Sequence, residues 1–475
     1  MTNRREIDFS VGPLFKKMII YALPIVGVNI LQLLFTAADL SVLGIFTGND
    51  NAIAAVGAAT PIINLCIAFF TGLSIGANVL IARCVGAHDL ERSKRYVGTA
   101  MLVSVIFGVI IMAVGLLLAE QMLIWTSCAP SVLPYATSYL KIYMIGIPII
   151  MLYNFCAAIL RAVGDTLRPL IFLLIGGVLN IGLNIFFITV VGLDIEGVAI
   201  ATVVSNAVSG GCAIVLMFKS NGYAKVERKN LRLYKKELIE IFKIGLPVAI
   251  SKCLFSFANV LVSANLNALG EEAMAAHSIT KEFDGFILEA VHGLGAATIA
   301  VISQNYGAKK IERIKKVVYL SILMQLVLGV TLGIILIFAG RALCGIMTDT
   351  KLVLDLCMVR ISTVSICYAV LGVLNVIQES IRGIGYSFTS TLISVFANII
   401  LRLIYLYFVY PYICITGNLA HNLRMLYVLY PASWIIAAVF ATIILIVLFN
   451  RVKRRFVVEK IIEKDNRADE REKIA

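Results

Sequence analysis

Charged and amide side chains lie inside strongly apolar stretches of this sequence. Asp39 stands in the segment Phe35-Thr-Ala-Ala-Asp39-Leu, and Asn180 and Asn184 stand four residues apart in another apolar segment. A charged side chain at the centre of a bilayer costs about 2.5–3.5 kcal/mol, so it is expected to face a cavity or a partner. Asp39 is therefore a candidate site for a cation or a proton. The alternative is an interfacial Asp near a helix end.

The two asparagines share one face of a predicted helix, because they are one helical turn apart. Their amide oxygens can bind a hard cation, and their amide groups can form hydrogen bonds with a substrate. Asn180 and Asn184 can equally well join neighbouring helices, as polar side chains commonly do in membranes. From the residues alone, this structural interpretation is the favoured one.

A second group of ionisable residues falls within twelve positions of a predicted spanning helix: Lys281, Glu282, Asp284, Glu289 and His292. At 100° per residue, Lys281 and His292 lie about 20° apart on the helix, and Asp284 lies about 60° from Lys281. We therefore expect these three side chains to share a face. His292 alone is not expected to bind a metal, because no second His or Cys stands beside it at ligand spacing.

Opposite charges in this part of the chain are expected to pair, because unpaired charges are costly at membrane depth. The expected partner of Asp284 is Lys252, in the preceding helix, or Lys281. The functional interpretation is a polar site for substrate or protons, and the alternative is a structural network of ion pairs. Arg402 and Glu379 allow the same two interpretations.

Several enzyme signatures can be set aside. Gly72-Leu-Ser-Ile-Gly76 matches the pattern of a hydrolase nucleophile elbow, but that motif needs a strand followed by a turn and a helix. Here it lies within a long apolar helix, where small residues predict close helix packing. The dipeptide Gly-Lys is absent, so the sequence contains no P-loop for ATP. We expect no enzyme activity and no cofactor.

The composition predicts a polytopic membrane protein. Of 475 residues, 60% are hydrophobic and 15% are charged, against about 45–50% and about 25% in soluble domains. Apolar runs long enough to cross a bilayer recur along the chain. The expected spans are 15–46, 53–83, 95–119, 136–158, 168–190, 196–218, 238–268, 275–304, 317–339, 358–381, 388–410 and 426–449.

The distribution of Lys and Arg predicts the orientation. Loops after the second, sixth and eighth spans are basic, whereas those after the first, third, fifth and seventh contain no Lys or Arg. This alternation places both termini in the cytoplasm of a cell that carries the protein in its plasma membrane. The net charge of +13 is therefore dispersed over short loops and the tail, which disfavours nucleic-acid binding.

The ten cysteines do not suggest a disulfide framework, because seven of them lie within or at the ends of apolar segments. Cys128, Cys344 and Cys414 are expected in or near outer loops. The polar N-terminus runs directly into a long apolar helix, so no cleaved signal peptide is expected.

The sequence repeats itself at an offset of 221 residues. Gly86-Ala-His-Asp-Leu-Glu-Arg corresponds to Gly307-Ala-Lys-Lys-Ile-Glu-Arg, and Arg161-Ala-Val-Gly corresponds to Arg382-Gly-Ile-Gly. Each half then holds six spans. Because six is even, the repeat is parallel, about an axis along the membrane normal. We expect an N-terminal lobe (1–218), a basic linker (219–237), a C-terminal lobe (238–450) and a charged tail (451–475).

In this order and spacing, the motifs resemble the multidrug and toxic compound extrusion (MATE) family, nearest to its bacterial DinF-type members. The resemblance covers roughly residues 10–450. The matching stretches are Leu23-Pro24 with Asp39, Gly86-Ala87, Leu160 to Thr166, Asn180 with Asn184, Gly197 to Thr202, Gly245-Leu-Pro247, Gln304 to Ala308, Arg382 to Gly385 and Tyr430 to Trp434.

The resemblance implies an all-α fold of two six-helix bundles arranged in a V around a central cavity. It also implies export of organic cations or amphiphiles coupled to H⁺ or Na⁺. It places Thr202 near the site of Asp39, Asn180 and Asn184, where Na⁺ is the only metal expected. One departure stands out: the family usually has Asp where this sequence has Asn184, so one carboxylate is missing.

We therefore expect a monomeric antiporter that exports small organic molecules by alternating access. Its coupling site is expected at Asp39, Asn180, Asn184 and Thr202. Its C-terminal polar or substrate site is expected at Lys252, Glu282, Asp284, Glu289, His292 and Arg402. The alternatives are a lipid-linked sugar flippase of a related bundle fold, which thirteen or fourteen spans would favour, an intramembrane enzyme, and a non-transporting receptor.

Overall fold

Long helices make up the whole architecture of the part of the chain that the computed structural model describes, residues 6–47, 50–267, 269–415 and 417–474. The first half contains α1 (Leu14–Thr47), α2 (Asp50–Ala87), α3 (Leu90–Trp125), α4 (Leu133–Ala162), α5 (Leu167–Phe186) and α6 (Ile195–Lys219). The second half contains α7 (Lys235–Asn267), α8 (Glu271–Gly307), α9 (Ile311–Gly345), α10 (Lys351–Val364), α11 (Tyr368–Gly383), α12 (Ser387–Val395), α13 (Leu401–Ile404), α14 (Tyr410–Ile413) and α15 (Leu419–Ile474).

Some of these helices join end to end into one span. Helices α10 and α11 form the span Lys351–Gly383, and α12 to α14 form Ser387–Ile413. Over the described residues, eleven spans are long and apolar enough to cross a membrane, and α7 runs alongside them as the twelfth. The predicted all-helical fold of twelve spans is confirmed. The helices extend beyond their predicted bounds, most of all α15, which continues into the charged tail.

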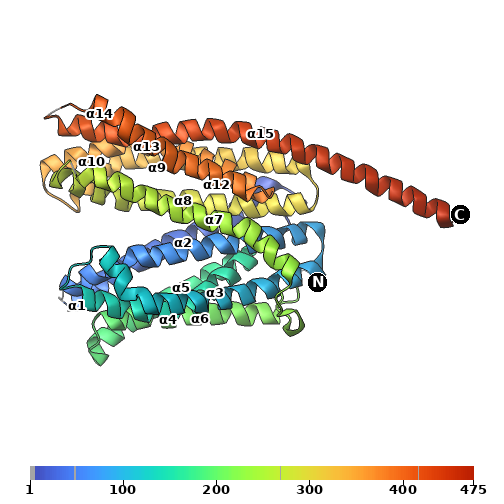
Figure 1. Ribbon diagram of the computed structural model, residues 1–475, viewed down its shortest axis with the longest axis horizontal. Helices are drawn as coiled ribbons and strands as arrows, with labels where there is room; N and C mark the ends of the chain where they lie inside the picture. Colours follow the sequence, from blue (N-terminus) through green and yellow to red (C-terminus); the bar gives the residue numbers. More distant parts are fainter. Residues whose placement is uncertain (1–5, 48–49, 268, 416, 475) are drawn as a thin grey trace.

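The helices form two lobes arranged in a V (Figure 1). Helices α1 to α6 form one lobe and α7 to α15 the other, and both ends of the chain lie at the same end of the bundle. We call this the terminal end. Contacts between the lobes extend from there to about the middle of the helices, where Cys253 Sγ lies 4.0 Å from the carbonyl oxygen of Leu65.

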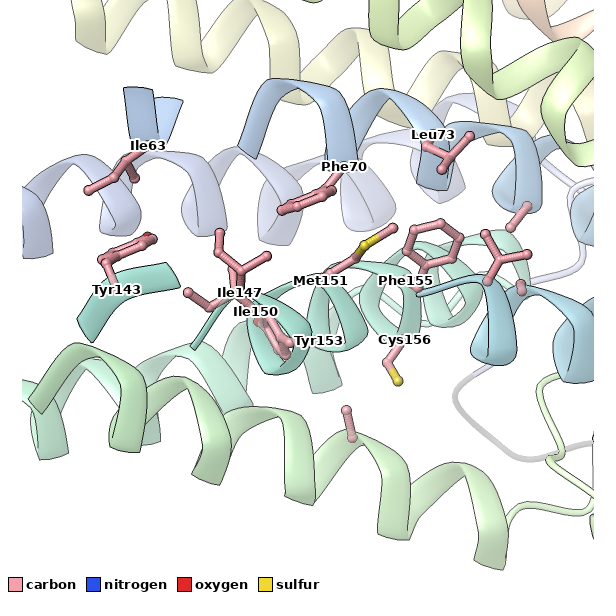
Figure 2. Packing of buried hydrophobic residues seen from close by; sticks show 14 of the residues in the cluster. Ile63, Phe70, Leu73, Tyr143, Ile147, Ile150, Met151, Tyr153, Phe155 and Cys156 are labelled. Carbon is pink, nitrogen blue, oxygen red and sulfur yellow. The ribbon is translucent and has the colours of Figure 1, made fainter. Parts of the chain in front are cut away.

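Each lobe has its own apolar core. In the first, side chains of α2 such as Phe70 meet side chains of α4 such as Ile147 and Met151, all fully buried (Figure 2). The second core contains α8, α11 and α15 side chains, including the buried Tyr427. In both cores large apolar side chains exclude lipid and solvent from the interior of the lobe.

The first helix of each lobe packs partly on the other lobe. Tyr21 and Ile25 of α1 belong to the second core, whereas Ile241 and Ile244 of α7 belong to the first. Helix α2 runs along α7, and α1 runs along α8. The lobes are therefore joined by two crossed helix pairs that the internal repeat relates to each other.

Small residues permit these close contacts. A Cβ atom added to Gly72 would lie 2.4 Å from the Cα of Ala249, and one added to Gly76 would lie 2.3 Å from the carbonyl oxygen of Ile241. Both separations are far below van der Waals contact. The prediction that the Gly72-Leu-Ser-Ile-Gly76 segment serves helix packing is confirmed.

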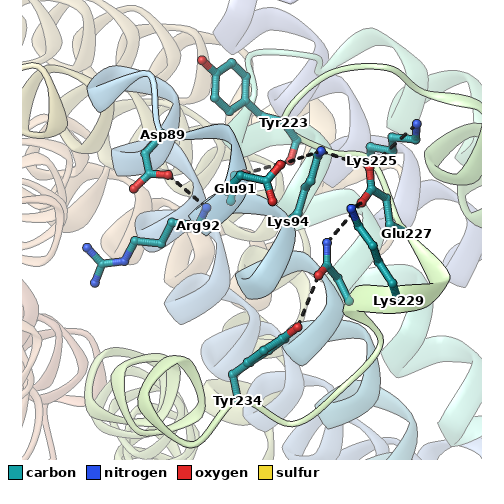
Figure 3. Close-up of polar contacts among 11 residues, drawn as sticks. Asp89, Glu91, Arg92, Lys94, Tyr223, Lys225, Glu227, Lys229 and Tyr234 are labelled. Carbon is teal, nitrogen blue, oxygen red and sulfur yellow. Dashed lines mark hydrogen bonds and ion pairs between the residues drawn. The ribbon is translucent and has the colours of Figure 1, made fainter.

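The linker between the lobes is bound to the first lobe by ion pairs (Figure 3). Glu227 lies 3.0 Å from Lys94 Nζ of α3 and 3.3 Å from Lys229 Nζ. The hydroxyl of Ser93 donates a 2.8 Å hydrogen bond to the carbonyl oxygen of Tyr223. The hydrogen bond from Lys94 lowers the pKa of Glu227 below its usual value of 4.5.

All ten cysteines are free thiols in this structure. Cys344 is fully buried near the end of α9, one residue before the helix ends. It ends in the core because α9 continues to Gly345, beyond the predicted end at residue 339.

Candidate functional site

The residues predicted to form a coupling site in the first lobe come together from three helices. Asn184 Nδ2 of α5 donates a 2.6 Å hydrogen bond to Asp39 Oδ1 of α1. Asn180, one turn earlier, donates a 3.4 Å hydrogen bond from Nδ2 to the hydroxyl oxygen of Thr202 on α6. Both asparagines are buried, and Asp39 and Thr202 are half-buried. The four predicted residues therefore line one polar region inside the lobe.

A pair of glycines on α5 brings these helices close enough for the contacts. A Cβ on Gly177 would lie 1.9 Å from the ring of Phe35 on α1, four residues before Asp39. A Cβ on Gly176 would lie 2.1 Å from the hydroxyl oxygen of Ser209 on α6. Larger side chains at either position would separate α5 from its neighbours, and would move Asn180 and Asn184 away from their partners.

The donor set of this region suits a hard cation. Asp39 offers a carboxylate, Asn180 and Asn184 offer amide oxygens, and Thr202 offers a hydroxyl oxygen. The Oδ1 atom of Asn184 is buried without a hydrogen-bond partner, which is costly for a polar atom. An orphaned acceptor next to a carboxylate is a place where Na⁺ or a proton-carrying group would be stabilised.

Both lobes contain π-helical turns next to their polar residues. In α5 such a turn covers Phe187–Val191 and begins three residues after Asn184. In the second lobe, two such turns, Phe396–Ile400 and Tyr405–Val409, flank Arg402. An extra residue in a helical turn re-aims the side chains around it and is frequent at functional sites.

The second lobe buries an ion pair that the sequence did not predict. Arg360 Nη2 of α10 lies 2.5 Å from Asp284 Oδ2 of α8, and both side chains are buried. Arg360 also forms a short hydrogen bond with His277 and lies over the ring of Tyr427, 5.1 Å from its centroid. The His277 ring nitrogen faces Tyr427 Oη at 3.3 Å. Asp284 is thus fully engaged within the lobe.

The prediction that Asp284 pairs with Lys252 or Lys281 is wrong. Lys281 is exposed, and Lys252 donates a 3.1 Å hydrogen bond to the hydroxyl of Thr71 on α2, across the lobe boundary. Asp284 also does not share the exposed face of Lys281 and His292, because the rotation of about 60° between Lys281 and Asp284 turns Asp284 into the lobe interior. Exposed His292 lies about 80° from Asp284 around the helix.

Arg402 is almost fully buried between aromatic rings. Its guanidinium lies 4.9 Å from the centroid of Tyr430 and 5.9 Å from that of Phe255, and its Nη2 donates a 3.3 Å hydrogen bond to Asn398 Oδ1. The guanidinium of Arg360 lies 6.0 Å from the centroid of the same Tyr430 ring, so this ring contacts both arginines. Such cation–π contacts help to hold desolvated guanidinium groups.

Glu379 has a local partner of its own. It forms a short, buried ion pair with Arg382, one turn later on α11. This pair and the Asp284–Arg360 pair are buried ion pairs of the kind that the structural interpretation predicted. A network of this kind could have been suspected from Arg360, which also lies in an apolar segment.

Three ionisable residues of α8 lie on its face toward the first lobe. A Cβ on Gly285 would lie 3.6 Å from the side chain of Leu33 on α1. Glu282, Glu289 and His292 lie within about 60° of Gly285 around the helix axis. Glu282 and His292 are exposed, and the carbonyl oxygen of Glu289 accepts a 3.1 Å hydrogen bond from Asn29 Nδ2 of α1. These three residues face the boundary between the lobes.

Comparison with known proteins places this geometry in context. The MatE family model matches residues 24–186 and 247–408, one stretch in each lobe. The chain is 26% identical over 397 residues to the "Probable multidrug resistance protein YoeA" of Bacillus subtilis, covering 82% of this chain and 85% of that protein. It is 25% identical over 394 residues to the "Multidrug export protein MepA" of Staphylococcus aureus, covering 82% and 84%.

Solved structures agree in fold over nearly the whole chain. A multidrug resistance MATE transporter in an outward-facing conformation superposes with a TM-score of 0.87 at 20% identity, covering 96% of this chain and all of that one. A Pyrococcus furiosus transporter of the MOP superfamily, described as having a binding pocket of reverse polarity, superposes with a TM-score of 0.85 at 20% identity, covering 95% and 100%.

Proposed function

Because this chain belongs to the MatE family of multidrug transporters, we propose that it is a secondary active exporter of small organic molecules. It works by alternating access between its two lobes, in antiport with H⁺ or Na⁺. The observation that carries the proposal is the polar region of Asp39, Asn180, Asn184 and Thr202, with the orphaned Asn184 oxygen at its centre.

The coupling cation acts through this region of the first lobe. Asp39 is the only carboxylate among the four residues, so it carries the charge that a cation or proton neutralises. Binding there changes the contacts between α1 and α5, because the Asp39–Asn184 hydrogen bond joins them. A cation can shift the balance between two conformations only through different affinities for them, and this helix contact supplies such a difference.

Substrate binds between the lobes, against the stripe of Glu282, Glu289 and His292. Two carboxylates on this stripe support an organic cation or a cationic amphiphile as substrate. Asp284 and Arg402 are assigned to the interior of the second lobe, where they support the shape of the site instead of contacting substrate. We propose that the protein lies in the plasma membrane as a monomer with both termini cytoplasmic, and in that orientation the described conformation is outward-facing.

A lipid-linked sugar flippase is the nearest alternative, and the twelve spans of the described chain favour the exporter. A receptor without transport activity has no support from the matched family. Transport itself separates these possibilities.

The test is efflux from sealed proteoliposomes loaded with a panel of fluorescent organic cations, anions and neutral amphiphiles. Each dye is tested under an imposed proton gradient, then under a sodium gradient, then under neither. Gradient-dependent movement of a cationic dye supports the proposal, and the effective gradient names the coupling ion. Equal dye release under all three conditions, or none from folded protein, would overturn it. Empty liposomes correct for passive leakage.

A further inference from the structure

Two hydrogen bonds join the lobes at the terminal end, and the internal repeat relates one to the other. Arg83 Nη2, in the last turns of α2, donates a 3.0 Å hydrogen bond to the carbonyl oxygen of Gly383 at the end of α11. Gln304 Nε2, in the last turns of α8, donates a 2.9 Å hydrogen bond to the carbonyl oxygen of Ala162 at the end of α4. The donors differ by 221 positions, and so do the acceptors, which is the offset of the repeated motifs.

The acceptors are carbonyl groups that a helix cannot satisfy by itself. Ala162 and Gly383 are the last residues of their helices, and the final four carbonyls of a helix lack intrahelical partners. Each lobe therefore satisfies a helix end of the other lobe. Opening of the terminal end would leave the Ala162 carbonyl without its donor, and would leave the Gly383 carbonyl with only the 3.4 Å hydrogen bond from Ser303 of its own lobe. Both bonds between the lobes therefore favour the closed arrangement.

The backbones of α2 and α8 also approach closely beside these bonds. A Cβ on Gly86 would lie 1.8 Å from the carbonyl oxygen of Gln304, and a Cβ on Gly307 would lie 2.0 Å from that of Arg83. Gly86 and Gly307 are again 221 positions apart. The repeated Gly-Ala motifs therefore meet each other across the lobe boundary, where only glycine leaves room for the opposing backbone.

The N-terminal segment before α1 is attached to one of the two bonds. Gln304 Oε1 accepts a 3.1 Å hydrogen bond from the amide of Phe9, a fully buried residue. Arg313 Nη2 of α9 donates to the carbonyl oxygens of Phe9 and Gly12, at 2.9 and 3.0 Å. The segment thus lies against the second lobe and contacts Gln304, the residue whose hydrogen bond to Ala162 joins the second lobe to the first.

The two donors are not chemically equivalent, and the difference explains this attachment. A guanidinium group only donates, whereas a glutamine side chain can donate and accept at the same time. The face of the Arg83 guanidinium stacks over the ring of Tyr306, 4.5 Å from its centroid. Gln304 instead uses its oxygen to bind the Phe9 amide. The two hydrogen bonds between the lobes are therefore related by the repeat, whereas the additional contacts of Arg83 and Gln304 differ.

We propose that Arg83 and Gln304 are a paired latch that holds the terminal end closed, and that the N-terminal segment reinforces the latch through Gln304. The inference rests on the proposed function, because it assigns these two positioning residues to the closed state of the transport cycle. Both bonds must break when the terminal end opens, and both re-form when it closes.

The latch can be tested by pulsed electron–electron spin resonance on the full chain in nanodiscs. Spin labels are placed at Glu91→Cys and Glu312→Cys, two exposed, repeat-related positions on α3 and α9. The background lacks the native cysteines. Gln304→Glu removes the donor for Ala162 but keeps an acceptor for Phe9, and Arg83→Ala removes the donor for Gly383. Each variant should raise the long-distance population relative to the short one roughly tenfold.

Matched variants separate a latch from general damage. Arg83→Lys keeps a donor and should retain most of the short-distance population. Gln121→Glu and Arg341→Ala change exposed residues away from the latch and should leave the distances unchanged. Removal of residues 1–9 should raise the long-distance population less than Gln304→Glu does. Unchanged distances in both Arg83→Ala and Gln304→Glu, in folded protein, would overturn the proposal. The distances do not depend on efflux, so a failed transport assay leaves this test intact.

Discussion

Asn184 of α5 donates a 2.6 Å hydrogen bond to the carboxylate of Asp39 on α1, and so links the helix at the lobe boundary to one inside the lobe. An aspartate at position 184, which the resemblance to related sequences had suggested, could not donate this bond without being protonated. Here the amide satisfies one oxygen of Asp39 while its own oxygen stays orphaned. The pair therefore combines one negative charge with one unused acceptor.

Replacement of Asp39 should uncouple transport. Asp39→Asn removes the charge but keeps the size of the side chain, so gradient-driven efflux should be lost while expression and folding stay nearly unchanged. Efflux from proteoliposomes and size-exclusion profiles measure the two effects. Asp355→Asn is the control, because Asp355 is exposed and pairs only with exposed Arg341 among the described contacts. Wild-type efflux by Asp39→Asn would remove Asp39 from the mechanism.

Gly177 should be needed for the position of Asp39. Gly177→Val places a side chain where the ring of Phe35 lies, and overpacking of this kind typically costs about 1–3 kcal/mol. We expect lower efflux and a lower melting temperature, measured by a thiol-reactive or scattering probe in detergent. Gly182→Val, five residues along the same helix, is the control, since nothing lies within 4 Å of a Cβ there. Equal effects of both variants would contradict the packing argument.

The buried Asp284–Arg360 pair should contribute to stability as a unit. Arg360→Met leaves Asp284 as a buried carboxylate without its ion-pair partner, which typically costs about 3–5 kcal/mol. The double variant Asp284→Leu with Arg360→Met should recover a large part of this loss. A double-mutant cycle of melting temperatures or unfolding free energies measures the coupling. Additive losses would show that the two residues do not act together, and full efflux by Asp284→Asn would confirm a structural role.

Cysteine labelling should reveal the orientation in the membrane. In a background without native cysteines, an impermeant maleimide should label Asn51→Cys and Glu271→Cys in intact cells. These residues are exposed and lie in the first turns of α2 and α8, whose last turns lie at the terminal end. Lys229→Cys, in the exposed linker, should be labelled only after the cells are opened. Labelling of Lys229→Cys in intact cells would reverse the proposed topology.

The linker should leave the first lobe only in acid. The hydrogen bond with Lys94 lowers the pKa of Glu227. The ionised carboxylate is therefore more stable in the folded state than in the unfolded state. This contribution is present above pH 4.5 and is lost as the pH falls through the lowered folded value. Hydrogen exchange of residues 220–234, corrected for intrinsic rates, should rise in that range. Glu227→Gln should show faster exchange already at pH 7, and its exchange should change little with pH.

Residue type and spacing were enough to predict the twelve spans, whereas the polar region of the first lobe was predicted only with the resemblance to the MATE family. The cost of burying a charge or an unpaired backbone in lipid acts on each segment separately, so length and hydropathy indicate the spans. Asp39 could be singled out for the same reason. The offset of 221 residues predicted the two-fold relation of the halves. Arg83 and Gln304 stand at this offset, and each donates a hydrogen bond to the other lobe.

Only the tertiary structure decided which charges meet. Asp284 pairs with Arg360, 76 positions away, and not with Lys252 or Lys281. The choice depends on how each helix is rotated about its axis, and a rotation of about 60° is enough to turn Asp284 from the lobe boundary into the core. It also depends on which helices pack together, as the exchange of α1 and α7 between the lobes shows. Hydropathy along one helix indicates neither its rotation nor its packing partners, because the side chains of the neighbouring helices determine both.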